Sequence, residues 1–117
     1  MTQIAVIGSG TMGNGIAHTF AQFGYKVNLI DINESALARA LENIKKNLDR
    51  QIAKGTLTLT DKDETLSRIK TFSNLQAGVA QADLVVEAAT ERLELKLEIF
   101  KELDRLAPEH AILASNT

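Results

Sequence analysis

Three glycines and one aspartate near the start of the chain have types and a spacing that point to chemistry. Gly8, Gly10 and Gly13 follow a short apolar run, and Asp31 comes 18 residues after Gly13. Glycines spaced as Gly-x-Gly-x-x-Gly let a pyrophosphate lie against bare backbone, and an acid at this distance accepts hydrogen bonds from a ribose. The pattern therefore predicts a dinucleotide-binding site.

Each glycine has its own role in this prediction. Gly8 allows a tight turn after the strand, Gly10 lets the pyrophosphate approach the backbone, and Gly13 lets the helix pack closely on the sheet. The free N–H groups of the first helical turn, with the helix dipole behind them, then bind the phosphate oxygens. Because glycine-rich turns occur in many folds, a phosphate-free strand-turn-helix unit is the alternative.

The elements around the glycines favour the nucleotide. We expect a strand over residues 4–7, a helix over about residues 11–23 closed by Gly24, and a second strand over residues 27–30 that ends at Asp31. This is the strand-turn-helix-strand context that the glycine motif requires. Helical spacing further predicts that the large apolar residues of the first helix belong to the core: Met12, Ile16, Phe20 and Phe23.

A long helix is predicted over residues 33–54, with Asn33 as its N-cap and Gly55 as its stop signal. Its apolar stripe at spacings of three and four consists of Leu37, Leu41, Ile44, Leu48 and Ile52. Its other face is basic and carries Arg39, Lys45, Lys46, Arg50 and Lys54. Such a face is either simply solvated or a binding surface for a phosphorylated ligand, and both interpretations stay open.

The rest of the chain alternates between strand and helix patterns. Residues 56–60 are expected to form a short extended piece, and Asp61 to cap a helix that ends near Arg68. The further elements are a strand over 69–73, a short helix or turn over 75–82, a strand over 83–87, a helix over 93–106 and a strand over 111–114. This alternation predicts an α/β fold, a Rossmann-like doubly wound parallel sheet with strand order 3-2-1-4-5 that stops after strand five. Ligands of such sheets bind beyond the carboxyl ends of the strands.

The composition is that of an ordinary globular domain and argues against several classes of function. The chain of 117 residues suffices for one domain with its own core, and a net charge of −2 without a basic stripe argues against nucleic acid. With no cysteine and two histidines we expect no metal site, and we expect His18 to be an exposed polar side chain. No signal peptide and no membrane span are expected either. These features favour a reducing compartment, the cytoplasm.

Four motifs together make the sequence resemble the short-chain 3-hydroxyacyl-CoA dehydrogenases, of the bacterial 3-hydroxybutyryl-CoA type. They are Gly-Ser-Gly-Thr-Met-Gly-Asn-Gly-Ile-Ala over residues 8–17, Asp-Leu-Val-Val-Glu-Ala over 83–88, Glu91 with Lys96, and Ala-Ser-Asn-Thr over 114–117. The glycine motif alone is shared with hydroxyisobutyrate and 6-phosphogluconate dehydrogenases. The long helix and the closing Ser-Asn-Thr favour the acyl-CoA enzymes, and the resemblance covers the whole chain.

The resemblance implies an NAD site and a coenzyme A site. The NAD pyrophosphate and the adenine-side ribose would be held by Gly8, Ser9, Gly10, Thr11, Met12, Gly13 and Asp31, with Ala88, Glu91 and Lys96 along the cofactor and Asn116 near the nicotinamide. Coenzyme A would contact the long helix through Lys54 and through Asn47, where the family usually has serine. Without the resemblance, Glu91 and Lys96 form only an exposed charged pair, and Glu87 has no assigned role.

The resemblance also implies that the catalytic residues lie outside this chain. The family's catalytic His–Glu pair, its substrate-contacting serine and a mostly helical dimerising domain all follow the position of residue 117. Residues 1–117 are therefore expected to be the NAD-binding domain of a longer, oligomeric enzyme that interconverts 3-hydroxyacyl-CoA and 3-ketoacyl-CoA, and to be inactive alone. The alternatives are a non-catalytic NAD-binding or structural module of the same fold and a dehydrogenase of small hydroxy acids.

Asp31 also predicts the choice of cofactor. NADP carries a phosphate where NAD has the ribose 2′-hydroxyl, so a carboxylate at this place repels NADP. Ile32, Asn33 and Glu34 follow Asp31, so no arginine comes next to compensate the repulsion. Arg39 lies further along the helix and is expected to face elsewhere. The sequence therefore predicts NAD as the cofactor.

Overall fold

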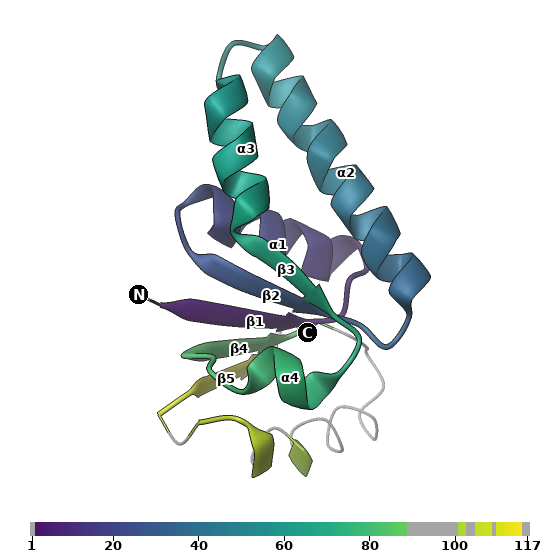
Figure 1. The fold of residues 1–117 in the computed structure, drawn as a ribbon, viewed down its shortest axis with the longest axis vertical. Coiled ribbons are helices and arrows are strands. Elements are labelled where there is room, and N and C mark those ends of the chain that lie inside the picture. The colour runs from purple at the N-terminus through teal and green to yellow at the C-terminus, as the bar shows by residue number, and fades with distance from the viewer. Residues whose placement is uncertain (1, 89–100, 103–104, 109, 116–117) are drawn as a thin grey trace.

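The computed structural model describes residues 2–88, 101–102, 105–108 and 110–115. The strands are β1 (Gln3–Ile7), β2 (Lys26–Ile30), β3 (Ile69–Phe72), β4 (Leu84–Glu87) and β5 (Ile112–Ser115), and the helices are α1 (Thr11–Gln22), α2 (Glu34–Ala53), α3 (Leu59–Ser67) and α4 (Leu75–Val79) (Figure 1). These bounds confirm the elements expected over this part of the chain to within a few residues, apart from the region before α3. Most of the helix expected over residues 93–106 lies outside the described residues.

The strands form a parallel, doubly wound sheet. β1 pairs with β2 on one side and with β4 on the other, and β2 pairs in turn with β3. The expected order 3-2-1-4 is thereby confirmed, and β5 pairs in parallel with β4. Because these strands are parallel, the carboxyl ends of β1, β2 and β4 lie at one edge of the sheet. The strand order reverses between β1 and β4, and a ligand is expected at that edge beside this point.

The middle of the sheet is buried on both faces, and β1 shows how. Ile4 and Val6 belong to one hydrophobic cluster, whereas Ala5 and Ile7, which alternate with them, belong to another. Because successive side chains of a strand point to opposite faces, the two clusters lie on the two sides of the sheet. Residues of α1 and α2 complete the first cluster, and residues of α4 contribute to the second (Figure 1). This double burial explains the continuous apolar run of β1.

Helix α1 turns small residues toward the sheet, and this corrects the expected core. Ala17 and Ala21 are fully buried, whereas Met12 is 58% exposed and Phe23 is 79% exposed. The core role expected for Met12 and Phe23 is therefore wrong, because the close contact between α1 and the sheet has room only for glycine and alanine. Two further members of the expected set pack at the margin of the cluster and are partly buried: Ile16 and Phe20.

The burial of His18, on the same helix, also differs from the prediction. The sequence predicted an exposed side chain, but His18 is only 9% exposed, and its Nε2 atom lies 2.8 Å from Gln22 Oε1. It lies one helical turn after Asn14, another buried polar residue, so the two share a side of α1. Polar residues thus occupy a buried side that the apolar periodicity of α1 did not indicate.

Helix α2 begins and ends as its sequence predicted. Asn33 is the N-cap, and its side chain accepts a hydrogen bond of 3.1 Å from the backbone N–H of Ala36. Gly55, just after the helix, has a φ of +77°, a conformation that other residues rarely adopt. α2 has 20 residues, yet no described helix combines the length and the apolar character that a membrane crossing needs.

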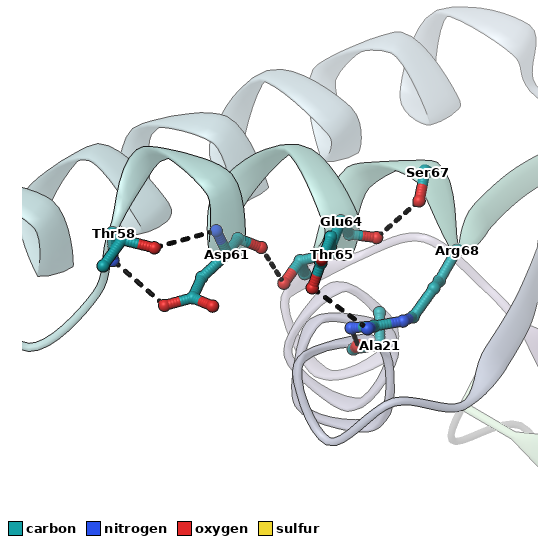
Figure 2. Close-up of polar contacts among 7 residues, drawn as sticks. All are labelled: Ala21, Thr58, Asp61, Glu64, Thr65, Ser67 and Arg68. Atoms are coloured by element: carbon teal, nitrogen blue, oxygen red, sulfur yellow. Dashed lines mark hydrogen bonds and ion pairs between the residues drawn. The ribbon is translucent and has the colours of Figure 1, made fainter.

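Helix α3 begins two residues before Asp61, so the expected extended piece and the expected cap are both wrong. Figure 2 shows that Thr58 is the N-cap and that Asp61 lies in the first turn, where the two exchange hydrogen bonds of 3.1 Å as a capping box. At the other end, the guanidinium of Arg68 donates to the carbonyl oxygen of Ala21 over 2.9 Å and lies 3.6 Å from Glu64. The hydrogen bond of Arg68 thus links the end of α3 to the end of α1.

Candidate nucleotide-binding site

The glycine turn lies at the carboxyl edge of the sheet, between β1 and α1. Gly8 has a φ of +101°, and its N–H donates to the carbonyl oxygen of Ile30 at the end of β2 over 2.7 Å. The positive φ requires glycine, as the tight-turn role predicted. The turn therefore begins beside the strand end that carries Asp31.

The start of α1 is open to an anion. Gly10 is the N-cap residue and has no side chain to cap the helix, and the first turn contains no acidic residue. A Cβ atom built on Gly10 would meet no atom within 4 Å, so the backbone there faces open space. The first N–H groups of a helix have no partner within the helix, and they bind phosphate oxygens readily. This end of α1 fits a pyrophosphate group.

Asp31 points its carboxylate back at the glycine turn. Its Oδ2 atom accepts hydrogen bonds from the hydroxyl of Ser9 at 2.7 Å and from the N–H of Ser9 at 3.1 Å. Its Oδ1 atom accepts a bond of 2.9 Å from the N–H of Asn33. The carboxylate that is predicted to bind the ribose is thus held next to the turn that is predicted to bind the pyrophosphate.

The surroundings of Asp31 keep its carboxylate ionised. Partial burial raises the pKa of Asp31, but the hydrogen bonds from Asn33 and Ser9 and the positive charge of Arg39 outweigh that effect. The pKa of Asp31 therefore lies below its ordinary value of 3.8. An ionised carboxylate only accepts hydrogen bonds, which suits the hydroxyl groups of a ribose.

A groove of about 560 Å³ runs from the glycine turn along α2. The residues of its walls come from the turn and α1 on one side and from α2 on the other, namely Ser9, Gly10, Thr11, Asn14, Gly15, Ala36, Arg39, Ala40, Asn43, Lys46, Asn47 and Arg50. None of these lining residues is acidic and three carry positive charge, so the groove suits an anionic ligand. Asn14 links the two walls, because its Nδ2 atom donates to the carbonyl oxygen of Ala40 over 3.0 Å.

The position of Arg39 differs from the one predicted from the sequence. The sequence placed it on a face directed elsewhere, but it lines the groove together with Ser9 and Gly10, and its charge acts on Asp31. The reason is that the first turns of α2 pass beside the start of α1. Only the packing of these two helices reveals this position, which the spacing within α2 does not.

The other predicted site residues divide into three groups. Thr11 and Met12 are exposed in the first turn of α1, and the N–H of Ala88 donates to the carbonyl oxygen of Ile7 over 2.8 Å, which places Ala88 beside the turn. Asn47 lines the groove, whereas Lys54 is exposed at the end of α2. The third group lies outside the described residues: Glu91, Lys96 and Asn116.

The two histidines take part in other contacts. His18 pairs with Gln22 on α1, and the His110 Nε2 atom lies 2.7 Å from Asp83 Oδ1. Asp83 also accepts a bond from the N–H of Gln3 at the start of β1, which is the edge of the sheet opposite the glycine turn. Within the described part of the chain, no three His, Cys, Asp or Glu side chains cluster as metal ligands would.

Glu87 had no role assigned from the sequence, and it is fully buried at the carboxyl end of β4. It pairs in register with Ile7, the last residue of β1. Its position is therefore beneath the site, at the strand ends that carry the turn.

The chain matches the family model of the 3-hydroxyacyl-CoA dehydrogenase NAD-binding domain over residues 3–117. It is 44% identical over 115 residues to a probable 3-hydroxybutyryl-CoA dehydrogenase of Bacillus subtilis, which covers 98% of this chain and 40% of that protein. It is also 44% identical over 114 residues to the 3-hydroxyadipyl-CoA dehydrogenase of Escherichia coli, covering 97% of this chain and 24% of that protein.

A solved structure agrees with these sequence matches. The crystal structure of 3-hydroxybutyryl-CoA dehydrogenase from Escherichia coli superposes with a TM-score of 0.96 at 43% identity, covering 99% of this chain and 24% of that chain. The chain thus spans less than half the length of each of these three relatives.

Proposed function

The chain belongs to the family of 3-hydroxyacyl-CoA dehydrogenase NAD-binding domains, and from this membership we propose that it holds NAD for an enzyme of 3-hydroxyacyl-CoA oxidation. The reaction interconverts a 3-hydroxyacyl-CoA, such as 3-hydroxybutyryl-CoA, and the 3-ketoacyl-CoA. Bound NAD supplies the hydride acceptor for this oxidation. The residues described here bind and orient the cofactor.

One observation carries the proposal: Ser9 joins the carboxylate of Asp31 to the glycine turn at the open start of α1. The pyrophosphate would lie on the backbone of residues 8–13, and the adenosine ribose would donate a hydrogen bond to Asp31. Because hydrogen bonds from Ser9 to Asp31 and from Gly8 to Ile30 join the ends of β1 and β2, the two subsites lie side by side. Binding of NADH to the chain, lost on replacement of Asp31, tests this part of the proposal.

The groove along α2 supports an acyl-CoA substrate over a small hydroxy acid. Coenzyme A carries several phosphate groups, and Arg39, Lys46 and Arg50 line the groove with positive charge. We place Asn47 in this groove as a hydrogen-bond partner of the coenzyme, although it already accepts a bond of 3.2 Å from Arg50. Lys54, at the end of the same helix, would pair with a phosphate. Binding of coenzyme A would exclude the small hydroxy acid alternative.

The proton transfer that accompanies the hydride step needs a general base. Among the described residues, His18 is buried against Gln22, and His110 pairs with Asp83 at the far edge of the sheet. We therefore propose that the base belongs to a further part of a longer protein, and that residues 1–117 form its NAD-binding domain. Purified chain should bind NADH without reducing acetoacetyl-CoA, whereas the longer protein should oxidise NADH in its presence. A longer protein without that activity would favour the non-catalytic module.

The proposal includes the setting of the domain. We propose that the five-stranded sheet of order 3-2-1-4-5 is the cofactor-binding unit of a homo-oligomeric enzyme. We also propose that this enzyme works in the cytoplasm, a reducing compartment, in line with the lack of cysteine in the chain. Sedimentation of the longer protein tests the oligomer, since a monomer at assay concentration would contradict it.

A further inference from the structure

We propose that Ser9 is a positioning residue for Asp31, and that its hydroxyl helps to set the preference of the domain for NAD over NADP. The inference rests on the proposed function, in which Asp31 binds the adenosine ribose. It adds a role for a side chain inside the glycine motif, where the motif itself specifies only the glycines.

Two hydrogen bonds join Ser9 to the same carboxylate oxygen. The hydroxyl and the N–H of Ser9 lie 2.7 Å and 3.1 Å from Asp31 Oδ2. Ser9 is 5% exposed, so water does not compete freely for its hydroxyl. A hydroxyl has one proton to donate, and this proton is used on Asp31. The bond is charge-assisted and short, which is the stronger kind of hydrogen bond.

The carboxylate of Asp31 has few acceptor positions left for a ligand. An ionised carboxylate has about four lone-pair positions, two on each oxygen. Among the described residues, Ser9 fills both positions on Oδ2 and the N–H of Asn33 fills one on Oδ1. One position on Oδ1 is left for a ligand. Asp31 would therefore accept a hydrogen bond from a single ribose hydroxyl.

Ser9 also fixes where that open position lies. It sits between Gly8 and Gly10, so the residue that holds the carboxylate is part of the turn that faces the pyrophosphate. Without the hydroxyl, the Asp31 side chain keeps only backbone donors and gains freedom to rotate. Ordering it again on binding then costs affinity, as with any ligand contact that is not preorganised. A carboxylate free to rotate away also repels the 2′-phosphate of NADP less.

The test compares three variants of the chain by calorimetric titration with NADH and NADPH. Ser9→Ala should weaken NADH binding by about threefold to tenfold, the range of one hydrogen bond, and should lower the NADH:NADPH preference. Ser9→Thr keeps the hydroxyl and should restore most of both. Ser67→Ala is the matched control, because the Ser67 hydroxyl donates over 2.6 Å to the backbone carbonyl oxygen of Glu64 on α3, away from the site. It should change neither the NADH affinity nor the preference.

A second readout separates positioning from a merely structural role. In an NMR titration of the Asp31 carboxyl, Ser9→Ala should raise its pKa, because a hydrogen bond to the charged form is lost, and Ser67→Ala should leave it in place. Should Ser9→Ala lower the melting temperature too far, the wild-type chain still tests the inference. NADH analogues without the adenosine 2′-hydroxyl or without the 3′-hydroxyl should then differ, with only one of the two binding more weakly.

Three outcomes would overturn the inference. One is unchanged NADH affinity in Ser9→Ala; another is an unchanged pKa of Asp31 in that variant; the third is an equal loss for both deoxy analogues. Asp31→Asn distinguishes this failure from that of the proposed function. If Asp31→Asn alters the NADH:NADPH preference and Ser9→Ala does not, only the role of Ser9 is refuted. If Asp31→Asn leaves the preference unchanged, Asp31 is not the ribose ligand and both fail.

Discussion

A Cβ atom on Gly13 would lie 1.7 Å from the carbonyl oxygen of Gly8, far closer than any real contact. The third glycine of the motif is therefore required by the approach of α1 to the end of β1. This contact seats the start of the helix against the strand and sets where its N–H groups lie. The glycine spacing is thus a packing requirement as well as a ligand requirement.

Gly13→Ala should lower the free energy of unfolding by about 1–3 kcal/mol or more, the usual cost of overpacking. The reason is that the opposing atom belongs to the backbone and cannot move away. NADH binding should fall as well. Gly15→Ala in the same helix is the matched control. A Cβ there meets no atom within 4 Å, so it should raise stability by about 0.5–1 kcal/mol. Urea unfolding of both variants is the measurement, and equal effects would refute the packing argument.

Asn14 should matter through its bond to α2. Replacement by alanine removes the 3.0 Å bond to the carbonyl oxygen of Ala40 in a buried contact, and should cost about 1–3 kcal/mol of unfolding free energy. The exposed Asn43, which lines the same groove, gives the control Asn43→Ala with little change expected. A stability of Asn14→Ala equal to that of Asn43→Ala would show that this bond does not hold the two helices together.

Asp31 should make stability depend on pH in acid. Its folded pKa lies below the ordinary value of 3.8, so the unfolded chain binds the proton first. The added stability is complete above the unfolded pKa and is lost as the pH falls through the folded pKa. Asp31→Asn should therefore show a smaller loss of unfolding free energy than wild type as the pH falls below about 4. The exposed Asp63→Asn on α3 serves as control, and curves of identical slope for Asp31→Asn and wild type would contradict the prediction.

Lys54, at the end of α2, should act on the acyl-CoA and not on the nucleotide. In the longer enzyme, Lys54→Glu is expected to raise the Michaelis constant for acetoacetyl-CoA and to leave that for NADH nearly unchanged, since a phosphate-pairing cation acts on binding. Lys45→Glu is the control, because the ammonium of Lys45 already lies 3.7 Å from the carboxylate of Glu42 on the same helix. No effect of Lys54→Glu, or equal effects on both substrates, would leave Lys54 as a solvated side chain.

Features with local signals were predicted from the sequence. The turn at Gly8, the cap at Asn33 and the stop at Gly55 follow from backbone conformations and hydrogen bonds made within a few residues. The place of Asp31 follows from the strand end that precedes it. The order of the first four strands follows from the alternation of elements, because right-handed crossovers leave few other arrangements.

Features that depend on packing between distant segments were not predicted. Met12 lies outside the core although the helical period includes it, since glycine and alanine occupy the side of α1 that meets the sheet. His18 and Asn14 are buried. Asn14 bonds to Ala40 of α2, and Arg39 reaches the groove, because α2 passes beside α1. The spacing of residues within one helix carries no information on where its neighbour lies. The signal that was present is the spacing of Asn14 and His18, two polar residues one helical turn apart in α1.

The charges of Asp31 and Arg39 both affect the choice between NAD and NADP. The 2′-phosphate of NADP would approach Asp31, and two such charges about 4 Å apart repel by roughly 1 kcal/mol in water and about 4 kcal/mol at a surface-like dielectric. Arg39 offsets part of this repulsion, because it lies where it acts on Asp31. Asp31→Ser with Ile32→Arg should narrow or reverse the preference, and the 91% exposed Ile32 gives room for the new arginine.

The most direct measurement is calorimetric titration of the unmodified chain with NADH and with NADPH at the same ionic strength. An ionised Asp31, held by Ser9 beside the glycine turn, predicts that NADH binds tighter by about fivefold or more. Equal affinities for the two cofactors would contradict the account, because Asp31 would then not be the ribose ligand.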